Sequence, residues 1–173
     1  MKEQQTKPSR ITVIGGGTMG TALAHLLGGK GFPVRLWVYE PELVESINIR
    51  HVNELFLPGL ELNENIFATS DMKEALENST KVLSVTPSQV LRHVWLDARQ
   101  YLSPEAEIIC CSKGIETATG LMMSEVFEEV LKADPRHLHA TYCLGIYFQH
   151  VGQNERAAEC FGRVAQSDPQ DAF

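Results

Sequence analysis

Short apolar runs alternate with helix-period segments through the first three quarters of the chain. Five runs of four or five residues are largely apolar or β-branched, and they occupy residues 11–14, 34–38, 66–69, 82–85 and 107–111. Runs of this kind are typical of strands that are buried on both faces of a parallel sheet. Because helical patterns separate the runs, the chain is predicted to form an α/β fold with a doubly wound parallel sheet of five strands.

Three segments between these runs carry the apolar spacing of helices. The first has apolar residues at positions i, i+3, i+4, i+7 and i+8, namely Met19, Ala22, Leu23, Leu26 and Leu27. The second begins at Pro41, since proline is favoured in the first turn of a helix. The third begins at Pro87 and Ser88, where the serine is a candidate helix cap.

The pattern changes after Leu131. From Ala133 onward the chain has no strand-like run, only two helix-period segments separated by residues 151–153. This change predicts two units, an α/β domain at residues 10–131 and a helical hairpin at residues 134–173.

Composition and charge exclude several classes of protein. Apolar residues make up 43% of the 173 positions and charged residues 21%, which is typical of globular proteins and not of disordered chains or coiled-coil rods. The net charge of −7 disfavours sequence-independent binding to nucleic acid or anionic membranes. No apolar run approaches the ~20 residues that span a bilayer, and residues 1–10 do not resemble a signal peptide. We therefore expect a cytoplasmic protein.

The metal-ligating residue types show no metal-site spacing. Four cysteines occur, Cys110, Cys111, Cys143 and Cys160, and no pair has the C-x-x-C spacing of a zinc or redox site. We expect them to be reduced and to serve as small buried apolar residues. The histidines show no ligand spacing either, so no metal site is predicted.

A glycine-rich loop joins the first predicted strand to the first predicted helix. Its sequence is Gly15-Gly16-Gly17-Thr18-Met19-Gly20, which has the G-x-G-x-x-G spacing of a Rossmann-like dinucleotide-binding turn. Gly15 would allow the tight turn, Gly17 would let a pyrophosphate approach the backbone, and Gly20 would let the helix pack on the strand. The free N–H groups of the helix start favour the phosphate charge. The loop predicts binding of NAD or NADP.

An acidic residue follows the second predicted strand. A carboxylate at Glu40 would accept hydrogen bonds from an adenosine ribose and repel a 2′-phosphate, which favours NAD over NADP. The neighbouring Tyr39 is the alternative candidate for the ribose-facing position.

Further blocks of sequence follow the glycine loop in a fixed order. They lie at residues 36–37, 40–44, 53, 56–59, 85–89, 112–116 and 119–122. Together with residues 11–20, their order and spacing resemble the opening of bacterial NAD(P)-dependent glycerol-3-phosphate dehydrogenases. The later blocks carry the specificity, because many other dehydrogenases share only the glycine loop.

The resemblance implies roles for individual residues. Thr18 and Met19 stand where the family's loop meets the cofactor. Tyr39 stands at the cofactor-facing position after the second strand, and Phe56 at an aromatic position near the nucleotide. Pro87, at the start of a helix, faces the cofactor cleft. Lys113 matches a lysine that touches both the cofactor and the phosphorylated substrate.

The resemblance also implies a reaction and shows departures from the family pattern. The reaction is reversible hydride transfer between dihydroxyacetone phosphate and sn-glycerol 3-phosphate, a step of phospholipid precursor synthesis. Met19 replaces a residue that is usually aromatic in the family. The family's Gly-Pro-Ser/Thr-Phe segment and catalytic helical domain find no match after Leu131. No catalytic residue is therefore assigned, and we expect the chain alone to turn over poorly or not at all.

The tail has a different resemblance. Residues 138–171 span 34 positions and match the pattern of one tetratricopeptide repeat through Leu144, Gly145, Phe148, Gly152, Ala157, Phe161 and Pro169. A single repeat cannot bury its own apolar face, so this segment must pack on its neighbour, bind a protein partner or be marginal. Two other readings of the chain therefore stay open beside the dehydrogenase domain: a protein-interaction module on a vestigial scaffold, and a recombination product without an evolved role.

Overall fold

A five-stranded parallel sheet forms the centre of the computed structural model, which describes residues 10–132, 154–156 and 158–159. The strand order is β5-β2-β1-β6-β7, and each neighbouring pair is parallel. The strands are β1 (Arg10–Ile14), β2 (Val34–Trp37), β5 (Ile66–Thr69), β6 (Ser79–Ser84) and β7 (Glu107–Cys110). The predicted Rossmann-like sheet and its five strands are confirmed.

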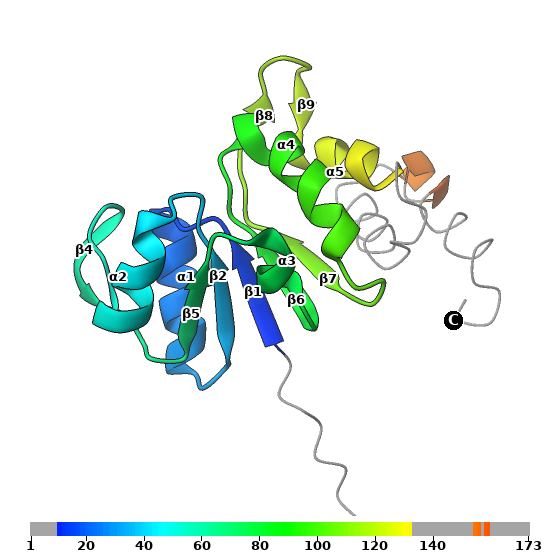
Figure 1. Cartoon of the computed structure of the whole chain (residues 1–173). Coiled ribbons are helices and arrows are strands. Elements are labelled where there is room, and N and C mark those ends of the chain that lie inside the picture. Colours follow the sequence, from blue (N-terminus) through cyan, green and yellow to red (C-terminus); the bar gives the residue numbers. More distant parts are fainter. Residues whose placement is uncertain (1–9, 133–153, 157, 160–173) are drawn as a thin grey trace, which may run out of the picture.

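Helices cover both faces of this sheet (Figure 1). One face carries α1 (Thr18–Gly29) and α2 (Glu42–Arg50), and the other carries α3 (Met72–Leu76), α4 (Ser88–Ala98) and α5 (Met123–Lys132). The three helices predicted from apolar spacing are confirmed. Pro41 and Pro87 directly precede their helices as N-cap residues, and no described side chain caps either helix. The expectation that Ser88 caps the third helix is wrong, because Ser88 is already its first helical residue.

Each face has its own apolar core. On the α1 and α2 side, Val13, Leu36 and Ile47 are fully buried. On the other side, Trp95 of α4 is fully buried and contacts Phe127 of α5 edge-to-face, with 4.8 Å between the ring centroids. The two cores keep α1 and α4 in fixed positions on opposite sides of β1 and β6.

Short elements complete the described chain and were not predicted. These are β3 (Val52–Asn53), β4 (Leu57–Glu61), the 3₁₀ turn η1 (Arg99–Tyr101), β8 (Ile115–Glu116) and β9 (Leu121–Met122). The pairs β3–β4 and β8–β9 are small antiparallel hairpins at the edges of the molecule (Figure 1). Elements of this length hold too few residues to show a period.

The predicted tetratricopeptide-like hairpin falls almost entirely outside the described residues. Within it, residues 154–156 and 158–159 are helical. Arg156 forms ion pairs with Glu125 at 3.0 Å and Glu128 at 2.6 Å, both on α5. Cys143 and Cys160 also lie outside the described residues. The repeat and the domain boundary at residue 131 stay predictions.

None of the helices in the described residues is long and apolar enough to cross a membrane.

Cys110 is exposed, so the expectation of a buried cysteine is wrong there, and Cys111 is half-buried. The reason is that Cys110 is the last residue of β7, which is an edge strand of the described sheet.

Candidate functional site

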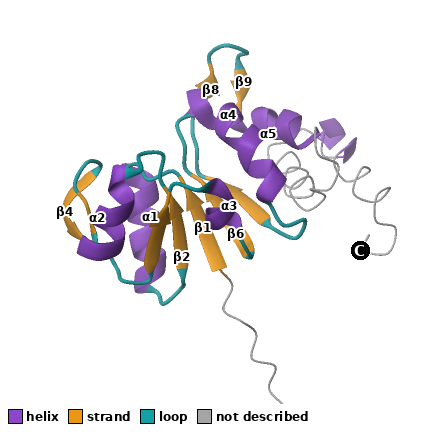
Figure 2. Cartoon of the chain, in the orientation of Figure 1, coloured by secondary structure: helices purple, strands orange, loops and turns teal. Residues whose placement is uncertain are grey.

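A cavity of ≈ 770 Å³ opens at the carboxyl ends of the strands, between the β1–α1 turn and the start of α4. Figure 2 shows the loops that leave the strands at this end of the sheet. The cavity lies where the strand order reverses, because the chain moves from β1 to β2 on one side and returns to β6 on the other. This switch point is where open α/β sheets bind ligands.

The glycine loop forms the floor of the cavity. Gly15 has a φ of +119°, and a Cβ there would lie 2.7 Å from the carbonyl oxygen of Val85. At Gly20 a Cβ would lie 1.8 Å from the Gly15 oxygen, which shows how closely α1 packs on the turn. A Cβ at Gly17 meets no described atom within 4 Å, so the backbone there is open to the cavity. Each glycine thus has the surroundings that its predicted role requires.

Hydrogen bonds hold this loop in place. The buried Asn53 amide donates to the Gly16 oxygen at 2.9 Å and to the Thr21 hydroxyl at 2.8 Å. Its own oxygen accepts from the Phe56 N–H at 3.2 Å. The Thr18 hydroxyl donates to the Phe56 carbonyl at 2.7 Å. Asn53 therefore joins the loop to the segment that carries Phe56, a role that its place in the sequence blocks did not reveal.

Two helix N-termini face the cavity. Gly17 is the N-cap of α1 and Pro87 that of α4, and no described side chain caps either helix. Neither helix has an acidic residue in its first turn, in contrast to α2, which has Glu42 and Glu45. The positive ends of both helix dipoles are thus available to an anion.

Nine of the ten residues predicted to contact the cofactor line the cavity. They are Gly15, Gly17, Thr18, Met19, Tyr39, Glu40, Phe56, Pro87 and Lys113. The tenth, Gly20, lies buried beneath the loop, as its packing role requires. The prediction missed further lining residues, namely Gly16, Trp37, Val85, Thr86, Ser88, Val90, His93, Val94, Cys111 and Ser112.

The described lining of the cavity contains one lysine, Lys113, one acidic side chain, Glu40, and no arginine. Glu40 follows Tyr39, which is 77% exposed and makes an edge contact with Trp37 at 6.4 Å between centroids. Burial raises the pKa of the Cys111 thiol, so this thiol is neutral at physiological pH. The cavity thus offers a single fixed cation.

One polar group in the cavity wall has no described partner. Thr86 is 5% exposed, and its hydroxyl forms no hydrogen bond within the described residues. The residues described hold no cluster of three or more histidine, cysteine or acidic side chains that could bind a metal ion.

The parallel sheet, the glycine turn at its switch point and the paired helix N-termini define a Rossmann-like dinucleotide-binding domain. Residues 10–145 match the model of the family described as NAD-dependent glycerol-3-phosphate dehydrogenase N-terminus. The chain belongs to this family.

Relatives and solved structures agree with this assignment. The chain is 47% identical over 122 residues to the glycerol-3-phosphate dehydrogenase [NAD(P)+] of Citrifermentans bemidjiense, a match that covers 70% of this chain and 36% of the relative. It is 42% identical over 130 residues to the enzyme of the same name from Bacillus cytotoxicus, covering 75% and 37%. The crystal structure of glycerol-3-phosphate dehydrogenase from Coxiella burnetii superposes with a TM-score of 0.64 at 32% identity and covers 72% and 37%. The matches thus span little more than a third of each relative.

Proposed function

We propose that the cavity binds a nicotinamide dinucleotide, with its pyrophosphate on the β1–α1 turn. The observation that carries this proposal is the open backbone at Gly17, which lies beside the uncapped start of α1. In such turns the pyrophosphate takes hydrogen bonds from the free N–H groups. Thr18 and Met19 would contact the cofactor from the same turn.

The remaining predicted residues would surround the rest of the dinucleotide. Tyr39 and Glu40 lie together at the end of the cavity beyond β2, where they would meet the adenosine ribose. The Glu40 carboxylate favours NAD, because a 2′-phosphate beside it would be repelled. Phe56 would contact the nucleotide from the other side of the turn, and Pro87 would face it from the start of α4. Lys113 would supply the positive charge for the cofactor and for a phosphorylated substrate.

Titration of the full chain with NADH and NADPH up to millimolar concentration tests the proposal. Trp37 lines the cavity, so energy transfer from tryptophan to the reduced nicotinamide gives the signal. We expect saturation with NADH at lower concentration than with NADPH. Saturation with neither dinucleotide would overturn the proposal.

A pair of glycine substitutions gives a matched control. Gly17→Ala places a methyl group where the pyrophosphate must approach, so the Kd for NADH should rise at least about tenfold. Gly29→Ala, at the far end of α1, also meets no described atom within 4 Å and should leave the Kd unchanged. Equal Kd values for the two variants would contradict a pyrophosphate at this turn.

For the whole reaction, we propose that the chain supplies the cofactor-binding part of a glycerol-3-phosphate dehydrogenase. The relatives carry this name, and the matched residues span about a third of their length. We expect no oxidation of glycerol 3-phosphate by the chain alone, and recovery of activity when the remaining part of a relative is added in trans. An interaction module at residues 138–171 stays an alternative prediction, which a pull-down with and without residues 136–173 tests.

A further inference from the structure

The residues around Lys113 form a short loop that is fixed at both ends. Upstream, the Cys111 N–H donates to the Ser84 carbonyl at 2.9 Å. Downstream, Gly114 has a φ of +107° and leads into β8. Lys113 thus lies between a contact to the sheet and the β8–β9 hairpin.

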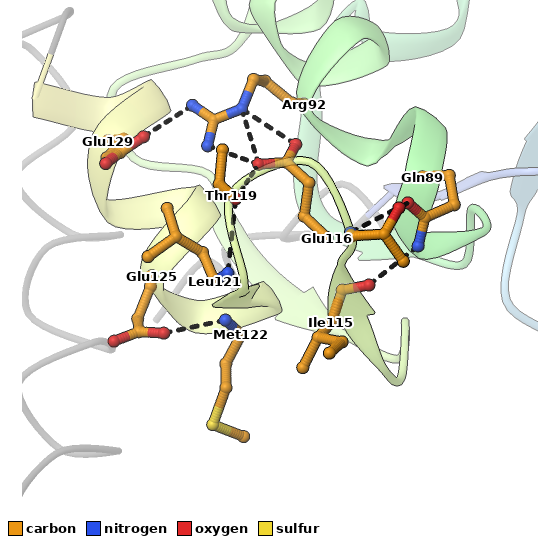
Figure 3. A network of polar contacts seen from close by, with 10 residues as sticks. Gln89, Arg92, Ile115, Glu116, Thr119, Leu121, Met122, Glu125 and Glu129 are labelled. Atoms are coloured by element: carbon orange, nitrogen blue, oxygen red, sulfur yellow. Dashed lines mark hydrogen bonds and ion pairs between the residues drawn. The ribbon is translucent and has the colours of Figure 1, made fainter.

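The hairpin is held against α4 by a set of polar contacts (Figure 3). The Gln89 amide donates to the Ile115 carbonyl at 2.8 Å, and its oxygen accepts from the Thr117 N–H at 3.0 Å. Arg92 lies three residues after Gln89 on the same helix and donates to both carboxylate oxygens of Glu116. The Nε–Oε1 distance is 2.9 Å and the Nη2–Oε2 distance is 2.8 Å. We call Gln89, Arg92 and Glu116 the α4 clamp.

The charges in the clamp are paired and partly withdrawn from water. The Glu116 side chain is 8% exposed, and its carboxylate also accepts from the Thr119 hydroxyl at 2.6 Å. Arg92 makes a second ion pair with Glu129 of α5 at 2.7 Å. Hydrogen bonds from Arg92 lower the pKa of Glu116, so the pair stays charged at neutral pH. A bidentate pair of this kind fixes orientation as well as distance.

Two different faces of α4 contact the cavity and the β8–β9 hairpin. Val90, His93 and Val94 line the cavity, whereas Gln89 and Arg92 hold the hairpin. One helix thus provides part of the cavity wall and also the contacts to the hairpin that follows the Lys113 loop.

We propose that the α4 clamp positions Lys113 for the bound dinucleotide. This inference rests on the proposed function, and Gln89, Arg92 and Glu116 are positioning residues that do not touch the ligand. Loss of the clamp should let the loop of residues 111–114 move, which weakens the contact of the lysine with the cofactor and leaves the rest of the cavity intact.

A double-mutant cycle on the full chain tests the inference. Lys113→Gln should raise the Kd for NADH about tenfold or more, because a charge-assisted contact is lost. Glu116→Gln should raise it about fivefold in the wild-type background and less than about twofold in the Lys113→Gln background. An equal factor in both backgrounds would mean a general structural effect and would overturn the inference, as would an unchanged Kd in Glu116→Gln.

Two further variants provide a second disruption of the clamp and a control at a distant ion pair. Gln89→Ala removes exposed contacts at the same hairpin and should give the same pattern with a smaller rise, even if Glu116→Gln fails to fold. Glu107→Gln removes a carboxylate that pairs with Lys81 at the opposite end of the sheet, and it should leave the Kd unchanged.

Hydrogen exchange separates this inference from the proposed function. Amides 113–117 should exchange faster in Glu116→Gln without any nucleotide present, and unchanged exchange would show that the clamp does not hold the loop. Failure of the wild-type chain to bind either dinucleotide would overturn the proposed function whatever the exchange result. Wild-type binding combined with no coupling in the cycle would overturn only the role of the clamp.

Discussion

The wall of the cavity formed by the β1–α1 turn is held by neutral hydrogen bonds, whereas the helix of the opposite wall, α4, is joined by ion pairs to the neighbouring β8–β9 hairpin and to α5. At the first wall, Asn53 binds the Gly16 oxygen and the Thr21 hydroxyl. At the second, Arg92 joins Glu116 and Glu129. One ligand site can therefore depend on two kinds of interaction, and only the stability that the ion pairs contribute changes with pH.

The largest expected effect breaks the first wall. Gly20→Ala would bring a Cβ to 1.8 Å from the Gly15 oxygen. This clash can be relieved only if the backbone of the turn or of α1 moves. We expect a loss of more than about 3 kcal/mol in the free energy of unfolding. Urea unfolding followed by circular dichroism measures it, with Gly17→Ala as the control that should keep wild-type stability. Similar midpoints for the two variants would show that the turn is less rigid than its contacts indicate.

The next effect separates the two walls by pH. Asn53→Ala should lower the Tm by about 5–10 °C at every pH, because it removes buried neutral hydrogen bonds. Glu116→Gln should lower the Tm at pH 7 by an amount on the order of 5 °C. The pKa of Glu116 is lowered by Arg92, so its stabilising contribution is complete above the ordinary glutamate pKa of about 4.3 and disappears as the pH falls toward the lower pKa of the folded state.

Thermal melts of both variants and the wild type between pH 7 and pH 3 check this prediction. The difference between wild type and Glu116→Gln should shrink below about pH 4.3, while that for Asn53→Ala should persist. A Glu116→Gln difference that stays constant across the range would contradict the assignment of charge to the second wall.

The smallest effect concerns the junction of the two walls at Thr86. Its buried hydroxyl has no partner among the described residues, so Thr86→Val should raise the free energy of unfolding by about 1 kcal/mol. Thr86→Ser keeps the hydroxyl, so its free energy of unfolding should not rise. Urea unfolding measures both, and a destabilised Thr86→Val would reveal a hydrogen bond that this hydroxyl makes in solution.

The first wall could be predicted from the sequence because its determinants are local. The glycine spacing at residues 15–20 and the apolar run before it specify a strand, a turn and a helix in direct succession. The same locality explains why all five sheet strands were predicted. Asn53 was noticed as part of a block, yet its hydrogen bonds reach back 37 positions to Gly16 and were not predicted.

The second wall could not be predicted because its contacts join distant positions. Arg92 and Glu116 are 24 residues apart, and nothing in either neighbourhood marks them as partners. The β8 and β9 strands have two residues each, which is too short for a periodic pattern. Lys113 was assigned through the resemblance and its place after the fifth strand, and the side chains that contact the hairpin after it became visible only in the structure.

The two hydrogen bonds to the Gly16 oxygen have a consequence for the energetics of binding. They direct this carbonyl inward, toward Asn53 and Thr21. A trans peptide is planar, so the N–H of Gly17 points the opposite way, and Gly17 lines the cavity. The donor for an incoming anion is therefore preorganised, and the entropy of ordering it is lost when the chain folds rather than when the ligand binds.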